Sequence, residues 1–385
     1  MKKKFALSFL TIASVALLAA CGEVSTSGSN TTGNEIGKEL KVGFNFEKTG
    51  EVAAYGSAEQ KGAQLAVDEI NAKGGADGKK IVVTDKDNKS ETAEAATVTT
   101  NLVTQSKVNA IVGPATSGAT AAAVANATKA GVPLISPSAT HDGLTKGQDY
   151  LFIGTFQDSF QGKIISNYVT NKLNAKKVVL YYDNSSDYAK GIAKSFQDSY
   201  KGEIVATETF QAKDTDFQAA LTKFKNKDFD AIVIPGYYTE AGKIVNQARG
   251  MGIDKPIVGG DGFNGEEFVQ QATPEKASNI YFVSGFSSTV DVSDKAKKFL
   301  EAYKAKYNEE PSTFAALAYD SVNLVANAAK GAKNSVEIRD NLAKTKNFEG
   351  VTGDTSFDEN HNTVKTAFMM TMENGKVTAA ETVKP

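Results

Sequence analysis

Cysteine and histidine are scarce in this chain of 385 residues. Cys21 is the only cysteine, and His141 and His361 are the two histidines. One cysteine cannot form a disulfide framework within the chain. A G-x-S-x-G motif and a P-loop are also missing, no Ser-His-Asp order surrounds His141, and His361 lies in a polar turn sequence. We therefore expect no catalytic residues and no enzymatic activity.

An excess of charge of either sign is missing as well. Lysine and arginine total 43 and aspartate and glutamate total 45, which leaves a net charge of −2 and no basic stripe. Nucleic-acid binding is not expected of such a chain. Residues 85–88 begin like a calcium loop but lack its glycine and its terminal glutamate, so no metal ion is expected. Residues 260–265 fit G-x-G-x-x-G, but only after the fourth strand of a series, and no cofactor is predicted.

The apolar run at the N-terminus is too short and wrongly flanked for a membrane span. Three lysines at 2–4 precede it, and it extends from Phe5 to Ala20, which is typical of a secretion signal. Small residues before Cys21 resemble a bacterial lipobox, in which this cysteine receives a diacylglyceryl group. We expect a signal peptide at 1–20 and a flexible tether at 21–38, rich in Ser, Thr, Gly and Asn. The mature protein is expected to be anchored by lipid to the extracytoplasmic face of the cell membrane.

Short β-branched runs alternate with helical patterns along most of the chain, which is typical of an α/β fold with parallel sheets. A first series predicts strands at 41–46, 80–85, 110–113 and 133–136, with helices at 58–71, 92–106 and 117–130. After a link through 150–155, a second series predicts strands at 177–182, 203–210, 231–235 and 256–259, with helices at 189–200, 216–226 and 240–251. The remainder predicts helices at 293–307, 312–332 and 335–345 and a closing hairpin of 365–373 and 376–381.

The two series indicate an internal repeat. The sequence at 41–44 corresponds to that at 177–180, and that at 110–112 to that at 231–233, with agreement in order, spacing and turn chemistry. We expect two Rossmann-like lobes, 39–157 with 286–364 and 158–285 with 365–385. Three crossings near Gln157, Ser284 and Val364 would join the lobes and act as a hinge.

Residues 110–120 are the stretch with the clearest functional pattern. An apolar run ends at Gly113-Pro114, and Thr116 and Ser117 then open an alanine-rich helix. The first turn of a helix has unpaired N–H groups and a positive dipole end, which suits a carboxylate. An ordinary Ser/Thr N-cap would give the same local sequence.

The loops beyond the carboxyl ends of the strands favour the ligand interpretation, because ligands of parallel sheets bind there. One lobe offers hydroxyl groups at this end, and the other offers an acid and aromatic rings. That division suits a zwitterion. We expect its carboxylate on Ser117 and Thr140, and its ammonium on Asp261 and a main-chain carbonyl near Ser138. The residues expected to enclose an apolar side chain are Tyr55, Ala115, Tyr237 and Phe314, and the second lobe also brings Tyr188 and Glu240 to this end.

From Leu40 to about Gly375 the chain resembles the type I substrate-binding proteins of branched-chain amino acid (leucine/isoleucine/valine) importers. The resemblance is carried by 54–56, 113–120, 136–140, Tyr188, Gly236-Tyr237 with Glu240, and 260–262. It implies a two-lobed periplasmic-binding-protein fold in which Ser117 and Thr140 hold the ligand carboxylate and Asp261 holds the ammonium. The ligand-binding residues it implies are Tyr55, Ala115, Thr116, Ser117, Ser138, Ala139, Thr140, Tyr188, Tyr237, Asp261 and Phe314.

The chain departs from the leucine-binding relatives in three of these positions. Those relatives have Glu at the position of Asp261, a larger apolar residue at Ala115 and Ala at Ser138, and they carry a cysteine pair that this chain lacks. The resemblance implies a branched-chain or another aliphatic L-amino acid as the ligand, and these departures leave the choice among such side chains open.

The resemblance also implies partners. These are two membrane permease subunits and two cytoplasmic ATPases of an ATP-driven (ABC) importer, served by a monomeric binding lipoprotein. The alternatives are a ligand-sensing receptor lipoprotein of the same fold and a binder of an amide or short carboxylate that is not an amino acid.

Overall fold

The structure is a computed structural model of the chain, and it describes residues 32–290 and 292–384. The expected signal peptide, Cys21 and the first part of the expected tether lie outside these residues. Among the helices described, none combines the length and the apolar content that crossing a membrane requires.

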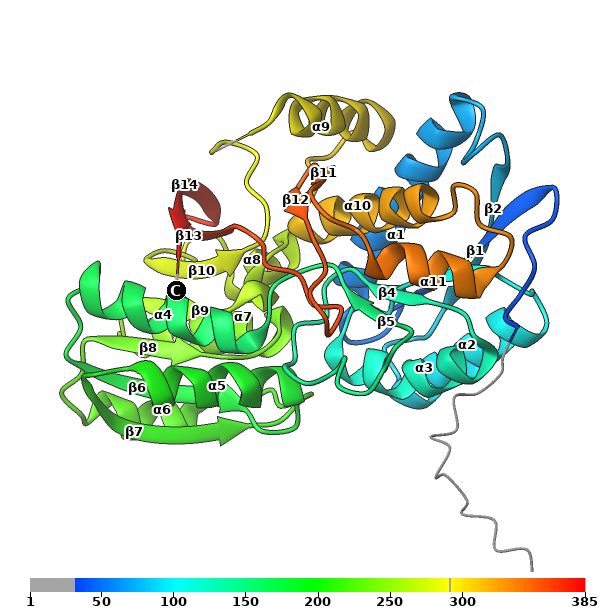
Figure 1. Cartoon of the computed structure of the whole chain (residues 1–385). Helices are drawn as coiled ribbons and strands as arrows, with labels where there is room; N and C mark the ends of the chain where they lie inside the picture. The colour runs from blue at the N-terminus through cyan, green and yellow to red at the C-terminus, as the bar shows by residue number, and fades with distance from the viewer. Residues whose placement is uncertain (1–31, 291, 385) are drawn as a thin grey trace, which may run out of the picture. The chain divides into compact units, whose positions relative to one another are not determined.

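The first lobe is built on a five-stranded parallel sheet with helices on both faces (Figure 1). Its strand order is β2-β1-β3-β4-β5. The strands are β1 (Glu39–Phe46), β2 (Lys80–Asp87), β3 (Ala110–Val112), β4 (Leu134–Ser136) and β5 (Leu151–Ile153). The helices are α1 (Ala53–Ala72), α2 (Thr92–Thr104), α3 (Ser117–Ala130), α9 (Asp294–Tyr307), α10 (Thr313–Ala328) and α11 (Ser335–Ala343).

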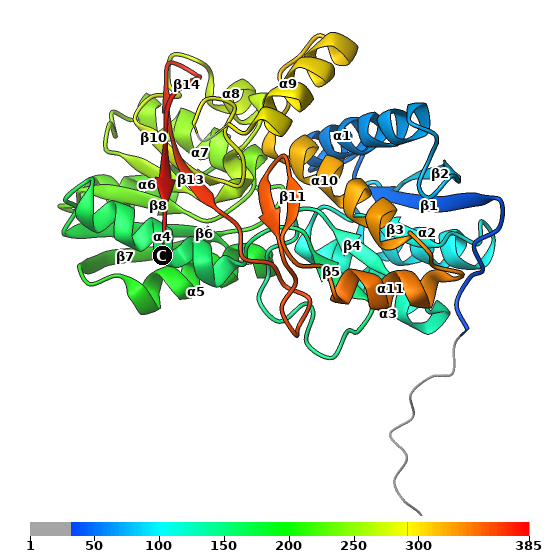
Figure 2. The same ribbon diagram turned by 45° about the horizontal axis from the view of Figure 1, so that its top comes forward.

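The second lobe is built on a seven-stranded sheet, again between two layers of helices (Figure 2). Its order is β14-β13-β10-β9-β8-β6-β7, with β13 antiparallel to both of its neighbours. The strands are β6 (Lys177–Asp183), β7 (Glu203–Phe210), β8 (Ala231–Ile234), β9 (Ile257–Gly259), β10 (Ile280–Ser284), β13 (Ala367–Glu373) and β14 (Lys376–Val383). The helices are α4 (Asp158–Asn171), α5 (Asp187–Ser199), α6 (Gln218–Lys225), α7 (Tyr238–Gly250) and α8 (Glu266–Ala272), with a short 3₁₀ helix at Asp261–Phe263.

The internal repeat expected from the sequence is confirmed by strand order and register. The order β2-β1-β3-β4-β5 of the first sheet is repeated as β7-β6-β8-β9-β10 in the second. Val42 of β1 pairs with Ala110 of β3, and Val178 of β6 pairs with Ala231 of β8 at the corresponding place. The two sheets are therefore two copies of one topology, and the chain is an α/β protein with parallel sheets.

Side chains of successive strand residues pack on opposite faces of each sheet, as the period of two requires. In the second lobe, Val178 belongs to one apolar cluster with Ile192 of α5, whereas Val179 belongs to another with Leu221 of α6. The strands are consequently buried on both faces and read as continuous apolar runs.

Several elements were not assigned from the sequence. Residues 151–153 form strand β5 rather than a link, because three residues are too few for a periodic pattern. Helix α4, which is mostly polar on its exposed side, and the hairpin of β11 (Phe348–Gly350) and β12 (Gly353–Thr355) were not assigned either, and α8 and β10 were given no range.

The chain passes between the two lobes three times. The passages lie between β5 and α4, between β10 and α9, and between β12 and β13. The third of these passages contains a buried lysine, Lys365. Its ammonium donates to Thr352 Oγ1 and to Thr355 Oγ1, each at 2.7 Å, and burial lowers its pKa.

The carboxylate of Asp320 holds the β11–β12 hairpin against helix α10. It accepts hydrogen bonds from the N–H groups of Val351 at 2.8 Å and Thr352 at 2.9 Å, and from Thr352 Oγ1 at 2.6 Å. Because Asp320 is buried, water could not take its place as the acceptor for these three donors.

We expect Asp320→Ala to lower the free energy of unfolding by about 2–4 kcal/mol, because it leaves two buried N–H groups without an acceptor. Urea denaturation followed by circular dichroism measures this change. Asp228→Ala is the matched control, since Asp228 is exposed and forms only a surface ion pair with Lys177; it should change stability by less than about 0.5 kcal/mol. Equal effects of the two substitutions would contradict the role given to Asp320.

Candidate functional site

A small cavity of about 20 Å³ lies where the carboxyl ends of the strands of both sheets meet. The residues that line it are Tyr55, Ala115, Thr116, Ser117, Ser138, Thr140, Tyr188, Tyr237, Asp261, Gly262 and Phe314. Ten of the eleven residues implied by the sequence are in this set. Ala139 is the exception, because its side chain packs in the apolar cluster under α3 with Leu134 and Leu151.

The hydroxyl of Ser117 joins two loops of the first lobe. It accepts hydrogen bonds from the N–H groups of Thr140 at 3.3 Å and His141 at 3.2 Å. The start of α3 and the loop after β4 are thereby held side by side. Helix α3 begins at Ser117 and ends at Ala130, as the sequence predicts, with Thr116 as its N-cap.

The expected anion cradle at the start of α3 is partly filled by the protein itself. Glu47, which follows β1, accepts hydrogen bonds from the N–H groups of Ala115 and Thr116, each at 3.0 Å, and from Thr116 Oγ1 at 2.9 Å. Burial raises the pKa of Glu47, and these three donors oppose the rise. Thr116 therefore serves an internal carboxylate and caps the helix at the N–H of Ala119, and Ser117 remains among the residues that line the cavity.

Gly113 allows this loop to approach β1. Its φ is +98°, and a Cβ at this position would lie 2.3 Å from the carbonyl oxygen of Asn45. A side chain would therefore be excluded by both backbone conformation and space.

Asp261 provides the acidic group of the second wall. Its Oδ1 accepts a hydrogen bond from the hydroxyl of Tyr188 at 2.8 Å, and its own N–H donates to Oε1 of Gln161 at 2.9 Å. The Tyr188 hydroxyl also accepts from the N–H of Gly262 at 2.9 Å. Burial raises the pKa of Asp261 to about 6, so the carboxylate is ionised at neutral pH.

Four aromatic rings from both lobes surround the cavity. The Tyr55 ring lies 4.3 Å from Phe314 and 5.7 Å from Tyr237, measured between centroids, and Tyr237 stacks on Tyr188 at 5.0 Å. The rings form the apolar part of a lining that also contains the hydroxyl groups of the first lobe and the carboxylate of Asp261.

Hydrogen bonds across the cavity hold the two walls together. The hydroxyl of Tyr55 on α1 donates to the carbonyl oxygen of Gly262 at 2.6 Å and accepts from the N–H of Tyr238 at 3.3 Å. The Tyr238 hydroxyl donates to the carbonyl oxygen of Glu51 at 3.0 Å. The structure therefore represents the lobes in a closed arrangement.

His141 and Asp158 lie beside the first crossing. Nδ1 of His141 is 3.6 Å from Oδ2 of Asp158, too far for a hydrogen bond but close enough for charge attraction. Contact with Asp158 raises the pKa of His141, and burial raises that of Asp158 to about 7. The pair connects the loop after β4 to the start of α4, and neither side chain lines the cavity.

Two residues near the cavity were missed by the sequence analysis, and one was misplaced. Glu47 and Glu59 are both buried beneath the first wall. Glu47 could have been found because it follows a strand at its carboxyl end, and Glu59 because it lies one helical turn after Tyr55. Glu240 accepts a hydrogen bond from the N–H of Lys213 at 2.9 Å and does not line the cavity, contrary to expectation.

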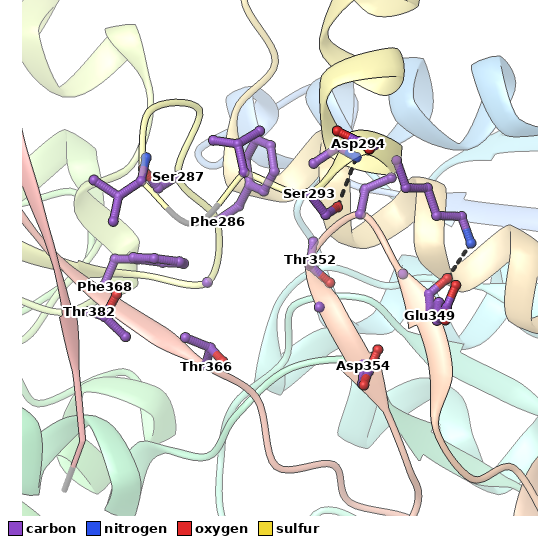
Figure 3. A pocket seen from close by; sticks show the side chains of 18 residues that line it. Phe286, Ser287, Ser293, Asp294, Glu349, Thr352, Asp354, Thr366, Phe368 and Thr382 are labelled. Atoms are coloured by element: carbon purple, nitrogen blue, oxygen red, sulfur yellow. Dashed lines mark hydrogen bonds between the residues drawn. The ribbon is translucent and has the colours of Figure 1, made fainter.

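A larger cavity of about 660 Å³ lies among the crossing segments (Figure 3). It is bounded by Phe286 and Ser287, the start of α9, the β11–β12 hairpin and β13. None of the buried polar atoms without a partner belongs to the side chains that line it. The smaller cavity has the convergent polar groups of a specific site.

Residues 39–376 match the periplasmic binding protein family. The chain belongs to this family. The binding protein is 29% identical over 351 residues to the Leu/Ile/Val-binding protein BraC3 of Rhizobium johnstonii, which covers 89% of this chain and 94% of that protein. It is 27% identical over 354 residues to the Leu/Ile/Val-binding protein of Escherichia coli K12, with coverage of 91% and 94%.

Solved structures of the same fold agree. The binding protein is 86% identical, with a TM-score of 0.89, to the branched-chain amino acid transporter substrate binding protein LivJ of Streptococcus pneumoniae in complex with isoleucine. That match covers 90% of this chain and 100% of the other. The leucine binding protein LivK of Thermotoga maritima is 30% identical with a TM-score of 0.85, covering 90% and 99%.

We expect Tyr55→Phe to loosen the contact between the two walls, because Gly262 loses its donor and the buried Tyr238 N–H loses its acceptor. Amide hydrogen exchange of the ligand-free protein should show faster exchange at Tyr238, by about fivefold to tenfold. Tyr307→Phe is the control, since its hydroxyl donates only to the carbonyl of Lys61 within the first lobe. Unchanged exchange at Tyr238 would show that the Tyr55 hydroxyl does not hold the walls together.

Proposed function

We propose that this chain is the extracytoplasmic substrate-binding lipoprotein of an ABC importer and that it captures a branched-chain L-amino acid in the cavity between its lobes. The observation that carries the proposal is the division of charge in the cavity. Hydroxyl groups and a helix N-terminus form one wall, and the carboxylate of Asp261 lies across from them among aromatic rings. The isoleucine described for the 86% identical streptococcal protein supports this ligand class.

The carboxylate of the amino acid would bind at Ser117 and at Thr140, where N–H and O–H groups converge. Ser117 Oγ and Thr140 N are 3.3 Å apart, close enough for one carboxylate to accept hydrogen bonds from both. Asp261 would receive the ammonium group, together with the main-chain carbonyl of Ser138. The Tyr188 hydroxyl fixes the carboxylate of Asp261 in this direction.

The aliphatic side chain would lie among Tyr55, Ala115, Tyr237 and Phe314. A cavity of about 20 Å³ holds no more than about one water molecule, so the walls must separate to admit a leucine-sized side chain. Burying such a side chain contributes about 1.5–3 kcal/mol, and each hydrogen bond to a charged group a similar amount.

The lipid anchor and the importer subunits lie outside the residues that the structure describes. Cys21 would carry the lipid that anchors the protein to the cell membrane. The loaded protein would deliver its ligand to two permease subunits driven by two cytoplasmic ATPases. Binding and release of the ligand, rather than a chemical reaction, is the role that the family supports.

We expect Ser117→Ala and Asp261→Ala each to weaken L-isoleucine binding by at least about tenfold, because each removes a hydrogen bond to a charged group of the ligand. Isothermal titration calorimetry measures the change. Asp198→Ala, an exposed carboxylate of the second lobe paired with Lys194, should leave the affinity unchanged. The site assignment fails if both cavity variants bind as tightly as the unaltered protein.

We also expect ligand binding to shift the lobes towards the closed arrangement about the three crossings. The radius of gyration measured by X-ray scattering should fall when saturating L-isoleucine is added. Asp261→Ala, examined at the same ligand concentration, should show a smaller fall because it binds less ligand. A radius that stays constant on saturation of the unaltered protein would argue against a hinge.

A further inference from the structure

Glu59 is a fully buried carboxyl group directly beneath the cavity. It lies on α1, one turn after Tyr55, and its exposed fraction is 0%. Its Oε1 is 2.5 Å from Oγ of Ser138, and its Oε2 has no hydrogen-bond partner. A buried carboxylate with a single partner is costly, since ionised carboxylates need several donors in an apolar interior.

The hydroxyl of Ser138 has more acceptors than hydrogens. Ser138 Oγ is 3.0 Å from the carbonyl oxygen of Ala115 as well as 2.5 Å from Glu59. A hydroxyl has one hydrogen, and an ionised carboxylate and a carbonyl can only accept. If Glu59 were ionised, one of the two oxygen pairs would lie at hydrogen-bonding distance with no hydrogen between them.

The groups around Glu59 supply no positive charge. None of the ion pairs within the described residues includes Glu59; Lys61, two residues later on α1, pairs with Glu309 at 2.7 Å. The ionisable group that acts on Glu59 from β1 is Glu47, another acid. In the loop after β4, His141 faces Asp158 instead.

Helix α10, which packs along α1, does not supply a cation either. Its ionisable residues Tyr319 and Asp320 are bound to Glu69 and to the 351–352 amides. Burial accordingly raises the pKa of Glu59 well above its ordinary value, with Glu47 adding to the rise.

We propose that Glu59 is a neutral carboxylic acid in the working protein and that it donates its proton to Ser138 Oγ, which in turn donates to the carbonyl of Ala115. This chain of two hydrogen bonds ties α1 to the loops after β3 and β4, and it places a hydrogen in each of the two close contacts of the Ser138 hydroxyl. Glu59 is thereby a positioning residue that directs the main-chain carbonyl of Ser138 towards the cavity.

The contacts of Ser138 and Glu59 limit which ligand side chains fit the cavity, an inference that rests on the proposed function. The Ser138 hydroxyl is engaged beneath the wall and is not offered to a ligand side chain. With Glu59 neutral, Asp261 is the only ionised carboxylate among the residues that line the cavity or lie under Ser138. The cavity then matches one ammonium group and a neutral side chain, and a cationic side chain such as that of lysine finds no second anion there.

The two buried glutamates should respond in opposite ways to the same substitution. Glutamine can replace a neutral Glu59, because its NH₂ group donates to Ser138 Oγ as the acid does. Glu47 accepts from three donors, and glutamine there would place an NH₂ group against an N–H. We expect Glu59→Gln to bind L-isoleucine within about threefold of the unaltered protein and Glu47→Gln to weaken binding by at least about tenfold.

The pH dependence of stability decides the proton on Glu59 without any ligand. A carboxyl whose pKa is raised by folding stabilises the fold fully below its ordinary value of 4.5, and that contribution is lost as the pH rises through the folded-state pKa. The melting temperature of the unaltered protein should therefore fall relative to that of Glu59→Gln by about 2 °C per pH unit as the pH rises from about 5 to the folded-state pKa, and the difference should stay constant at higher pH. Infrared spectra of the ligand-free protein at neutral pH should show a protonated-carboxyl band that Glu59→Gln removes.

The opposite result would overturn the proposal. If Glu59 were ionised at neutral pH, the difference in melting temperature between the two proteins would not change above about pH 7, and the substitution would remove no carboxyl band. These two measurements need no amino acid, so they can support or refute the proton on Glu59 even if the protein binds a different ligand. A protonated Glu59 whose replacement by glutamine abolishes L-isoleucine binding would contradict the positioning role alone.

Discussion

Three hydrogen bonds to the carboxylate of Glu47 hold the loop on which the first wall of the cavity depends. They connect the end of β1 to the start of α3, so the first N–H groups of that loop are satisfied inside the protein. Because Ala115 and Thr116 are fixed in this way, Ser117 is placed against the loop after β4, and its hydroxyl meets the N–H of Thr140. The N–H groups of Ala115 and Thr116 are therefore not available to an external anion, and the position of the Ser117 hydroxyl beside Thr140 is fixed.

The repeated topology explains why two walls of different chemistry face each other. Both lobes follow one strand order, and each presents the loops after its corresponding strands at the same end. The first lobe uses this end for hydroxyl groups and a helix N-terminus, whereas the second uses it for Asp261, Tyr188 and Tyr237. Equivalent loops of two similar scaffolds therefore place different polar groups on the two sides of the cavity.

Buried acids are used differently at each place around the cavity. Asp261 keeps an open side towards the cavity and one hydroxyl donor, Glu47 takes three internal donors, and Glu59 has a single partner whose hydrogen is already required elsewhere. The contact of Asp261 with Tyr188 fixes its carboxylate, so the second wall is defined by the pair rather than by the acid alone.

Much of the fold was predictable because it depends on local patterns. Buried parallel strands give continuous apolar runs, and the run at 110–112 followed by Gly113 and two hydroxyl residues marks the start of α3 correctly. Strand β5 could not be recognised, since three residues carry no periodicity and only their pairing with β4 makes them a strand. The β11–β12 hairpin likewise depends on Asp320, which is distant in the sequence.

The sequence by itself determined the repeated α/β pattern and the loops that carry Ser117, Thr140 and Asp261, because strand period and helix capping act over a few residues. The tertiary structure alone decided which polar groups remain for a ligand. Glu47 fills part of the expected cradle, Ala139 turns into the apolar cluster, and the hydroxyl of Tyr55 closes the walls. Each of these outcomes depends on burial and on partners up to about two hundred residues away, which no local pattern contains.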